Sequence, residues 1–425
     1  MTLRDEIWGA VLPQVQDYRL ETADEPHVIA EQCRQIARKI TQTREAESLD
    51  AAGLGLSDAD LGWIDEQLDA LLGAGPIERY LRRPDVENLY VFGPDRAVLG
   101  LSGGRQERID EPLFANEDEM IRYVSHLATT HGQTGRRFDH SAPLLDLRLR
   151  TGERVFAAMA VCGTPYLTVR CHRHRLIRLE DLIGSGSLSE QAGDLLRAAV
   201  RPPAPANVLV CGALGSGKTT LLRALLAEVG EHEIVCTLEQ TFELFLDESH
   251  PHTFAVETRE ANSDGEGEIT MEELAKRSLR SGADRVIVGE LRGSEAATFL
   301  SACGTGSDGS MATIHASSPR QALSRLVRYC LASGLAGAQS ALIQEAAEVI
   351  HLVVHMHSDP RTGFRGVRTI SEVLGSPGDR FEVHDIFGRR QRGQPLTLLG
   401  RPRNPDVLER LAEGGLDVSG WPSGA

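Results

Sequence analysis

Lysine is scarce in this sequence. Its 45 basic residues include only three lysines, Lys39, Lys218 and Lys276, and the rest are arginine. Long apolar segments are lacking too. No run approaches the ~18 residues that a bilayer-spanning helix needs, and the residues after Met1 form no apolar signal segment. We therefore expect no integral membrane segment, a cytoplasmic location, and only peripheral association with any membrane.

Paired cysteines and positive charge are also limited. Seven cysteines are scattered along the chain, which predicts small core residues in a reducing compartment and no disulfide framework. The net charge of −16 argues against a general nucleic-acid-binding protein, so no nucleic-acid partner is expected. Residues 171–174, Cys-His-Arg-His, match no zinc spacing and are interpreted as a basic strand end.

The sequence does contain a phosphate-binding loop. Residues 212–219 read Gly-Ala-Leu-Gly-Ser-Gly-Lys-Thr, which is a glycine, four residues and Gly-Lys-Thr. The glycines let backbone N–H groups turn toward phosphate oxygens, the lysine supplies a positive charge, and the threonine hydroxyl is a ligand for Mg²⁺. The predicted nucleotide-binding residues here are Gly212, Leu214, Gly215, Ser216, Gly217, Lys218, Thr219 and Thr220.

The flanking sequence has the order that such a loop requires. Residues 207–211, Asn-Val-Leu-Val-Cys, predict a short buried strand, and Leu221, Leu222, Leu225 and Leu226 recur at helical spacing after the loop. A strand, a loop and a helix in this order place the positive end of the helix under the phosphates. We therefore expect the chain to bind ATP with Mg²⁺.

Three further predicted strands end in polar residues. Residues 233–239 end in Glu239, residues 285–290 end in Glu290, and a strand from 311 carries His315 near its end. A carboxylate at the position of Glu290 holds Mg²⁺ through water or polarises the attacking water. Spacing alone leaves two alternatives open, because Glu239 fits a solvated strand end and His315 fits a satisfied core histidine.

The chain divides into four regions by composition and periodicity. The sequence predicts a helical extension for residues 1–75. It predicts a separate α+β domain for residues 76–182, with short strands and a helix near 118–130. Residues 187–388 predict an α/β domain with a parallel sheet around the phosphate-binding loop. The tail, 389–425, is expected to be loosely ordered apart from a short helix near 405–413.

Four ordered segments together resemble the type II/type IV secretion traffic ATPases, most closely the CpaF/TadA branch that powers Tad-type pili. Besides the phosphate-binding loop, residues 237–244 resemble the family's Asp-box, Gly289-Glu290-Leu291-Arg292 its Walker B pattern, and residues 305–316 its His-box. The match covers roughly residues 80–388. Gly152-Glu153-Arg154-Val155 and Leu167-Thr168-Val169-Arg170 also resemble a turn and a strand of the family's N-terminal domain.

The resemblance implies a RecA-like P-loop ATPase core and a homo-hexameric ring that works with an inner-membrane platform protein in pilin assembly or protein export. It implies that Arg154 and Arg170 reach the nucleotide phosphates when the N-terminal domain closes. Lys218 would then hold phosphate, and Thr219 and Glu290 would order Mg²⁺. Glu290 would also orient water, Glu239 would be the second carboxylate, and His315 the phosphate sensor.

Two residues depart from the family pattern. Gln240 stands where the family has Asp, and Ser307 stands where it has the first histidine of the His-box. If both groups acted in the transition state, their loss would slow turnover. We therefore expect slow hydrolysis. Two alternatives remain, an assembly subunit that binds nucleotide without hydrolysing it and a nucleic-acid motor on the same core.

Overall fold

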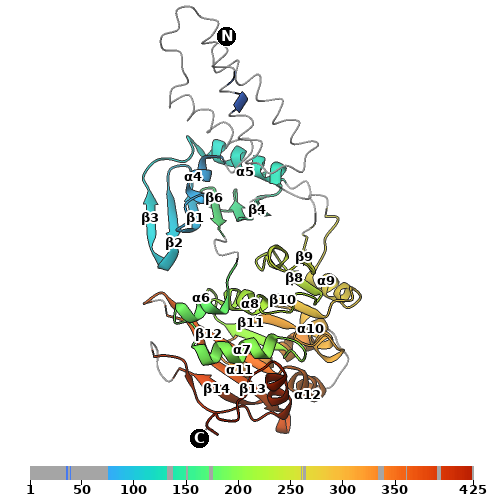
Figure 1. Cartoon of the computed structure of the whole chain (residues 1–425). Helices are drawn as coiled ribbons and strands as arrows, with labels where there is room; N and C mark the ends of the chain where they lie inside the picture. The colour runs from blue at the N-terminus through green and yellow to red at the C-terminus, as the bar shows by residue number, and fades with distance from the viewer. Residues whose placement is uncertain are drawn as a thin grey trace, which may run out of the picture. The chain divides into compact units, whose positions relative to one another are not determined.

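The computed structural model describes most of the chain after residue 74. It covers 75–131, 137–149, 152–171, 176–259, 261, 265–333, 339–359, 361–389 and 394–423, together with Gln35, Ile36 and Lys39. Gln35, Ile36 and Lys39 are helical, and the other residues of the predicted helical extension before Gly75 lie outside this description, as do residues 172–175. The chain divides into two compact units, Met1–Arg173 and His174–Ala425 (Figure 1). None of the described helices combines the length and apolar character that crossing a bilayer requires.

The first unit is built on an antiparallel six-stranded sheet. Its strand order is β3-β2-β1-β6-β5-β4. Alternate residues such as Leu89, Val91, Val155 and Val169 are buried with α5, so the helix covers one sheet face. The elements are η1 (Gly75–Ile77), α4 (Glu78–Leu81), β1 (Val86–Phe92), β2 (Ala97–Leu101), η2 (Ser102–Gly104), β3 (Gln106–Ile109), α5 (Glu117–His131), β4 (Leu144–Arg148), β5 (Arg154–Ala158) and β6 (Tyr166–Arg170).

The second unit is built on a mixed nine-stranded sheet in the order β15-β14-β13-β12-β7-β11-β10-β8-β9. The six strands from β12 to β9 are parallel, and β13, β14 and β15 add antiparallel strands at one side. The strands are β7 (Val208–Gly212), β8 (Val235–Glu239), β9 (Thr253–Glu257), β10 (Arg285–Leu291), β11 (Met311–His315), β12 (Leu352–Asp359), β13 (Phe364–Gly375), β14 (Glu382–Gly388) and β15 (Thr397–Leu398).

Helices cover both faces of this sheet. One face packs against α6, α7, α8 and α13, and the other against α9, α10, α11 and α12. The described helices of the second unit are α6 (Leu179–Gly184), α7 (Glu190–Val200), α8 (Lys218–Leu226), η3 (Leu246–Glu248), α9 (Met271–Ser278), α10 (Glu295–Gly304), α11 (Pro319–Ala332), α12 (Gln339–Val349), η4 (Pro377–Asp379) and α13 (Pro405–Glu413).

The apolar sequence of β7 explains its central place. Val208 and Val210 belong to one hydrophobic cluster, while Leu209 and Cys211 belong to the cluster on the opposite face. A strand buried on both faces needs an unbroken apolar run, because successive side chains point to opposite sides. The phosphate-binding loop therefore leaves the sheet at its centre, between β11 and β12.

The expectation of a loosely ordered tail is wrong for its described part. The helix at 405–413 is present, but Leu396, Val407, Leu411 and Val418 are buried in the same cluster as α7 and β7. Proline and glycine content suggested disorder, whereas apolar residues spaced along the tail complete the core. In addition, α6 packs with α7 and α8 in the second unit, although the sequence placed the domain boundary near 182–187.

Candidate functional site

The phosphate-binding loop connects β7 to α8 by a turn that only glycine accommodates. Gly215 and Gly217 have φ of 69° and 92°, which is the left-handed region. A Cβ atom on Gly212 would lie 2.5 Å from Ser216 Oγ and 2.7 Å from the Met356 carbonyl oxygen. Because the loop runs directly into α8, the unpaired N–H groups of that helix N-terminus can meet an anion.

Lys218 is folded back over this loop. Its side chain is buried, and Nζ donates a hydrogen bond to the Ala213 carbonyl oxygen at 3.1 Å. Nζ also lies 3.4 Å from His315 Nδ1. Burial lowers the pKa of Lys218 and is opposed by the negative charge of Glu290. A phosphate oxygen that replaced the Ala213 carbonyl oxygen would give this ammonium group a charged and therefore stronger partner.

The ends of β10 and β11 carry a continuous chain of polar contacts. His315 Nε2 lies 2.7 Å from Glu290 Oε1, and Glu290 Oε2 accepts from Arg292 Nη2 at 2.5 Å. Arg292 Nη1 in turn donates to Gln240 Oε1 at 2.8 Å. The structure thus brings Lys218, His315 and Glu290 together, and it adds Arg292, to which the sequence analysis assigned no role. The signal in the sequence that could have identified Arg292 was its place in the Gly-Glu-Leu-Arg segment.

His315 is held as a neutral imidazole. Burial lowers its pKa, the nearby ammonium of Lys218 lowers it further, and Glu290 opposes both. With Nδ1 facing the Lys218 ammonium, Nε2 carries the proton and lies beside Glu290. A neutral histidine between a cation and a carboxylate can respond to charge added beside either neighbour.

Glu239 lies at the end of β8, beside the end of β10. It is 2 % exposed, and its Oε2 accepts hydrogen bonds from the backbone N–H groups of Glu243 at 2.7 Å and Leu244 at 2.9 Å. A Cβ atom on Gly289 would lie 3.3 Å from its Cγ, so that glycine makes room for it. Burial raises the pKa of Glu239 to about 7, against the effect of the two N–H donors. A carboxyl that titrates near neutrality is suited to proton transfer.

The remaining predicted loop residues differ in exposure. Ser216 is buried and donates from Oγ to the Ala213 carbonyl oxygen, whereas Leu214 is 80 % exposed. Thr219 and Thr220 lie half-buried in the first turn of α8. The described part of the chain holds no cluster of three His, Cys, Asp or Glu residues that could bind a metal by itself. A hydroxyl and a nearby carboxylate instead fit Mg²⁺, which takes few protein ligands and fills its shell with phosphate and water.

Arg154 and Arg170 lie in the first unit. They face each other across β5 and β6, and Arg148 of β4 faces Arg154 in turn. Three arginines are therefore neighbours in one row, although like charges in directly opposed positions are unfavourable. No signal in the sequence singles out Arg148, because only the strand register reveals that it joins the other two. The predicted contact of Arg154 and Arg170 with phosphate stays a prediction.

Ser307 lies far from His315 and from the carboxyl edge of the nine-stranded sheet. It precedes β11, whose first residue, Met311, pairs with Val208, whereas His315 pairs with Gly212. Five strand residues span about 13 Å, so Ser307 and His315 lie at opposite edges of the sheet. Ser307 belongs to the loop at the amino edge, where its N–H donates to the Ala302 carbonyl oxygen. Of the two departures from the family pattern, only Gln240 lies at the carboxyl edge.

Comparison with known proteins gives consistent matches. A family described as type II/IV secretion system protein matches residues 105–378. A putative conjugal transfer protein of Mycobacterium tuberculosis is 32 % identical over 318 residues, which cover 72 % of this chain and 86 % of that protein. The type IV secretion system protein PtlH of Bordetella pertussis is 35 % identical over 237 residues, covering 49 % and 68 %. The structure of the Legionella pneumophila ATPase DotB matches 69 % of this chain and 78 % of its own, with a TM-score of 0.50 and 19 % identity, which supports the fold.

Proposed function

The chain belongs to the type II/IV secretion system protein family, and we propose that it is the ATP-hydrolysing motor of such a system. The observation that carries this proposal is the contact series from Lys218 through His315 to Glu290 beside the phosphate-binding loop. These groups come from three separate segments and converge at the carboxyl edge of the sheet. In open α/β sheets, this edge is where ligands bind.

Each residue has a distinct role in the proposed reaction. The loop N–H groups and Lys218 bind the phosphates, and Thr219 with Glu290, through water, would hold Mg²⁺. When bound, Mg²⁺ neutralises charge on the phosphate oxygens. Glu290 orients the attacking water, and Glu239, with its raised pKa, is the second carboxylate that exchanges a proton near neutral pH. His315 senses phosphate because it contacts both Lys218 and Glu290.

We further propose a finer identity within the family. The boxes in the sequence resemble the CpaF/TadA branch, which would make this chain a Tad-type pilus assembly motor. A homo-hexameric ring at the cytoplasmic face of the inner membrane, docked on a platform protein, would couple hydrolysis to pilin assembly or export. The conjugal transfer and type IV secretion names of its relatives support a motor of this general kind.

A nucleotide-binding assembly subunit is the second candidate. It is favoured by Gln240, which meets Arg292 with a neutral amide where the family has a carboxylate. Arg292 is therefore shared between a single acid, Glu290, and an amide. Binding of ATP without turnover at any oligomeric state would support this candidate.

The experiment is Mg²⁺-ATP hydrolysis by the full chain over a concentration series, with light scattering on the same samples. Wild type should turn over ATP with a rate that rises as the ring forms, and Lys218→Ala should lower the rate at least about 100-fold. Lys276→Ala, which removes an exposed lysine from α9, serves as the matched control and should retain most of the rate. Equal rates for wild type and Lys218→Ala would contradict the proposal.

A further inference from the structure

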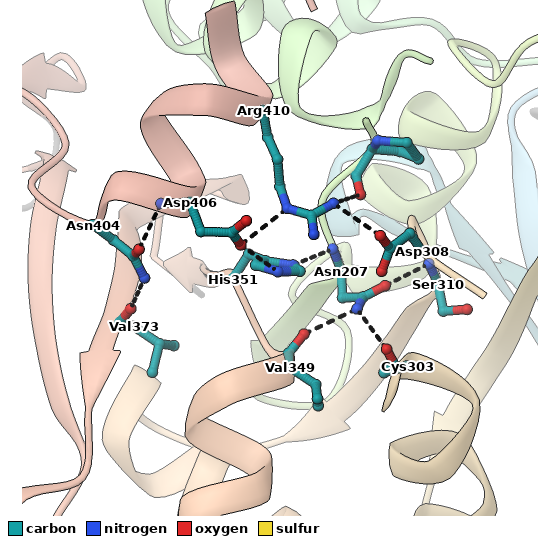
Figure 2. Close-up of polar contacts among 11 residues, drawn as sticks. Asn207, Cys303, Asp308, Ser310, Val349, His351, Val373, Asn404, Asp406 and Arg410 are labelled. Carbon is teal, nitrogen blue, oxygen red and sulfur yellow. Dashed lines mark hydrogen bonds and ion pairs between the residues drawn. The ribbon is translucent and has the colours of Figure 1, made fainter. Parts of the chain in front are cut away.

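The amino edge of the nine-stranded sheet carries a second polar cluster, on the opposite side from the nucleotide site. Figure 2 shows Asn207 at its centre, with side chains from α13 reaching toward it from one side. Asn207 immediately precedes β7 and is fully buried. Its Nδ2 donates to the Val349 carbonyl oxygen at 2.9 Å, and its Oδ1 accepts from the Ser310 N–H at 2.9 Å. One residue thus ties together the starts of β7 and β11 and the end of α12.

His351 links this residue to the C-terminal helix. Its Nδ1 accepts a hydrogen bond from the Asn207 N–H at 2.8 Å, so its proton must be on Nε2, which lies 2.8 Å from Asp406 Oδ2. Protonating Nδ1 would break the bond to Asn207. The buried imidazole therefore stays neutral, and its role is to hold Asn207 and Asp406 at a fixed separation.

Arg410, one turn further along α13, makes the second link (Figure 2). Its Nη1 donates to the Pro205 carbonyl oxygen at 2.7 Å and to Asp308 Oδ2 at 3.2 Å, and its Nε donates to Asp406 at 3.0 Å. Pro205 lies on the segment that enters β7, and Asp308 lies in the loop that enters β11. A planar guanidinium with several donors can set the distance between these segments, which a single hydrogen bond cannot.

The start of α13 is itself fixed to the sheet. The N–H groups of Arg403 and Asn404 donate to the buried carboxylate of Glu372 on β13 at 2.7 and 2.9 Å, and Asn404 Nδ2 donates to the Val373 carbonyl oxygen at 2.7 Å. The helix is therefore a fixed support for Asp406 and Arg410.

The two strands that α13 holds at their amino ends are the ones whose carboxyl ends carry the nucleotide site. Val208 pairs with Met311 at the start of the shared ladder, and Gly212 pairs with His315 at its end. Because the ladder is short and its residues are close-packed, a shift at one end moves the other. We propose that Asp406 and Arg410 are positioning residues, which set the placement of β7 and β11 and thereby align Lys218 with His315.

This inference rests on the proposed ATP hydrolysis, so its test has a readout that does not need turnover. In the full chain, Arg410→Ala should lower kcat about tenfold at 25 °C with KM for ATP within about twofold, since small misalignments of reacting groups are costly. Arg410→Lys should recover part of kcat. Glu409→Ala, an exposed neighbour on the same helix, is the matched control and should behave as wild type. Asp308→Ala combined with Arg410→Ala should cost little more than Arg410→Ala alone.

Amide hydrogen exchange measured without nucleotide supplies the independent readout. Arg410→Ala should speed exchange in peptides covering 208–220 and 304–316, relative to Glu409→Ala. If wild type shows no turnover, the proposed function fails and the exchange result alone decides the positioning role. A variant with a lower melting temperature but unchanged kcat and unchanged exchange in these peptides would overturn the inference. If Arg410→Ala does not fold, Asp308→Asn, which keeps the size of the side chain, takes its place in both measurements.

Discussion

The two edges of the nine-stranded sheet use polar residues in different ways. At the amino edge, Asn207, His351 and Arg410 each bond to groups that the protein itself supplies, such as the Val349 carbonyl at the end of α12 and the Pro205 carbonyl before β7. At the carboxyl edge, Lys218 is buried with a single carbonyl acceptor and a neighbouring imidazole. One edge is built to stabilise the fold, while the other keeps charge close together and available for a ligand.

The difference shows how polar residues of a binding site can be told from polar residues that only stabilise the fold. Both edges contain a histidine that bridges a nitrogen donor and a carboxylate. For His351, burial lowers the pKa to about 4, and both ring nitrogens have fixed partners. His315 contacts two charged side chains of opposite sign, each of which can be drawn toward a phosphate or a metal ion. A histidine indicates a functional site when the charged side chains beside it can also contact a ligand, and the histidine alone is a weaker indication.

The sharpest way to break the comparison is to truncate one buried polar residue at each edge. Asn207→Ala should lower the free energy of unfolding by about 3–4 kcal/mol, because it strands the Val349 carbonyl and the Ser310 N–H without partners. Lys218→Ala should leave that free energy unchanged or raise it, because it removes a desolvated ammonium. Denaturant unfolding of both variants measures this. Equal destabilisation by the two substitutions would show that the edges do not differ.

The pH dependence of the free energy of unfolding tests the buried Glu239 at the carboxyl edge. Its pKa is about 7 in the folded chain against an ordinary 4.5, so the folded state binds the extra proton between these values. The contribution of Glu239 to stability is complete below about pH 4.5 and is lost as pH rises to about 7, a change of about 3 kcal/mol. Glu239→Gln should lack this change, so it should gain stability relative to wild type between pH 5 and pH 8. Parallel unfolding curves across that range would contradict the burial of an ionisable acid.

The smallest expected effects separate the two departures from the family pattern. Gln240→Asp places a charge beside Arg292 at the carboxyl edge and should change kcat about threefold to tenfold. Ser307→His lies at the amino edge and should change kcat less than about twofold. Steady-state kinetics of both single variants and the double variant measure this. A larger effect of Ser307→His than of Gln240→Asp would contradict the expectation that only residue 240 acts at the nucleotide site.

The pattern of apolar residues in short stretches of the sequence was sufficient to predict much of the core. The strands β7, β8, β10 and β11 lie within a residue or two of the predicted positions, because the signals that define a strand are carried by its own residues. The helix at 405–413 was also predicted, but its burial was not, since its apolar stripe gains meaning only when α7 lies opposite.

By itself, the sequence determined the phosphate-binding loop, the order of the strands that carry Glu239, Glu290 and His315, and the likeness to a family of secretion proteins. Each of these is written in neighbouring residues, whose spacing limits what the backbone can do. The tertiary structure alone decided that Ser307 lies at the edge opposite His315, that Arg148 joins Arg154 and Arg170 in one row, and that α13 clasps the starts of β7 and β11. These pairings join residues distant in the chain, and they depend on strand register and packing, which no short stretch of sequence encodes.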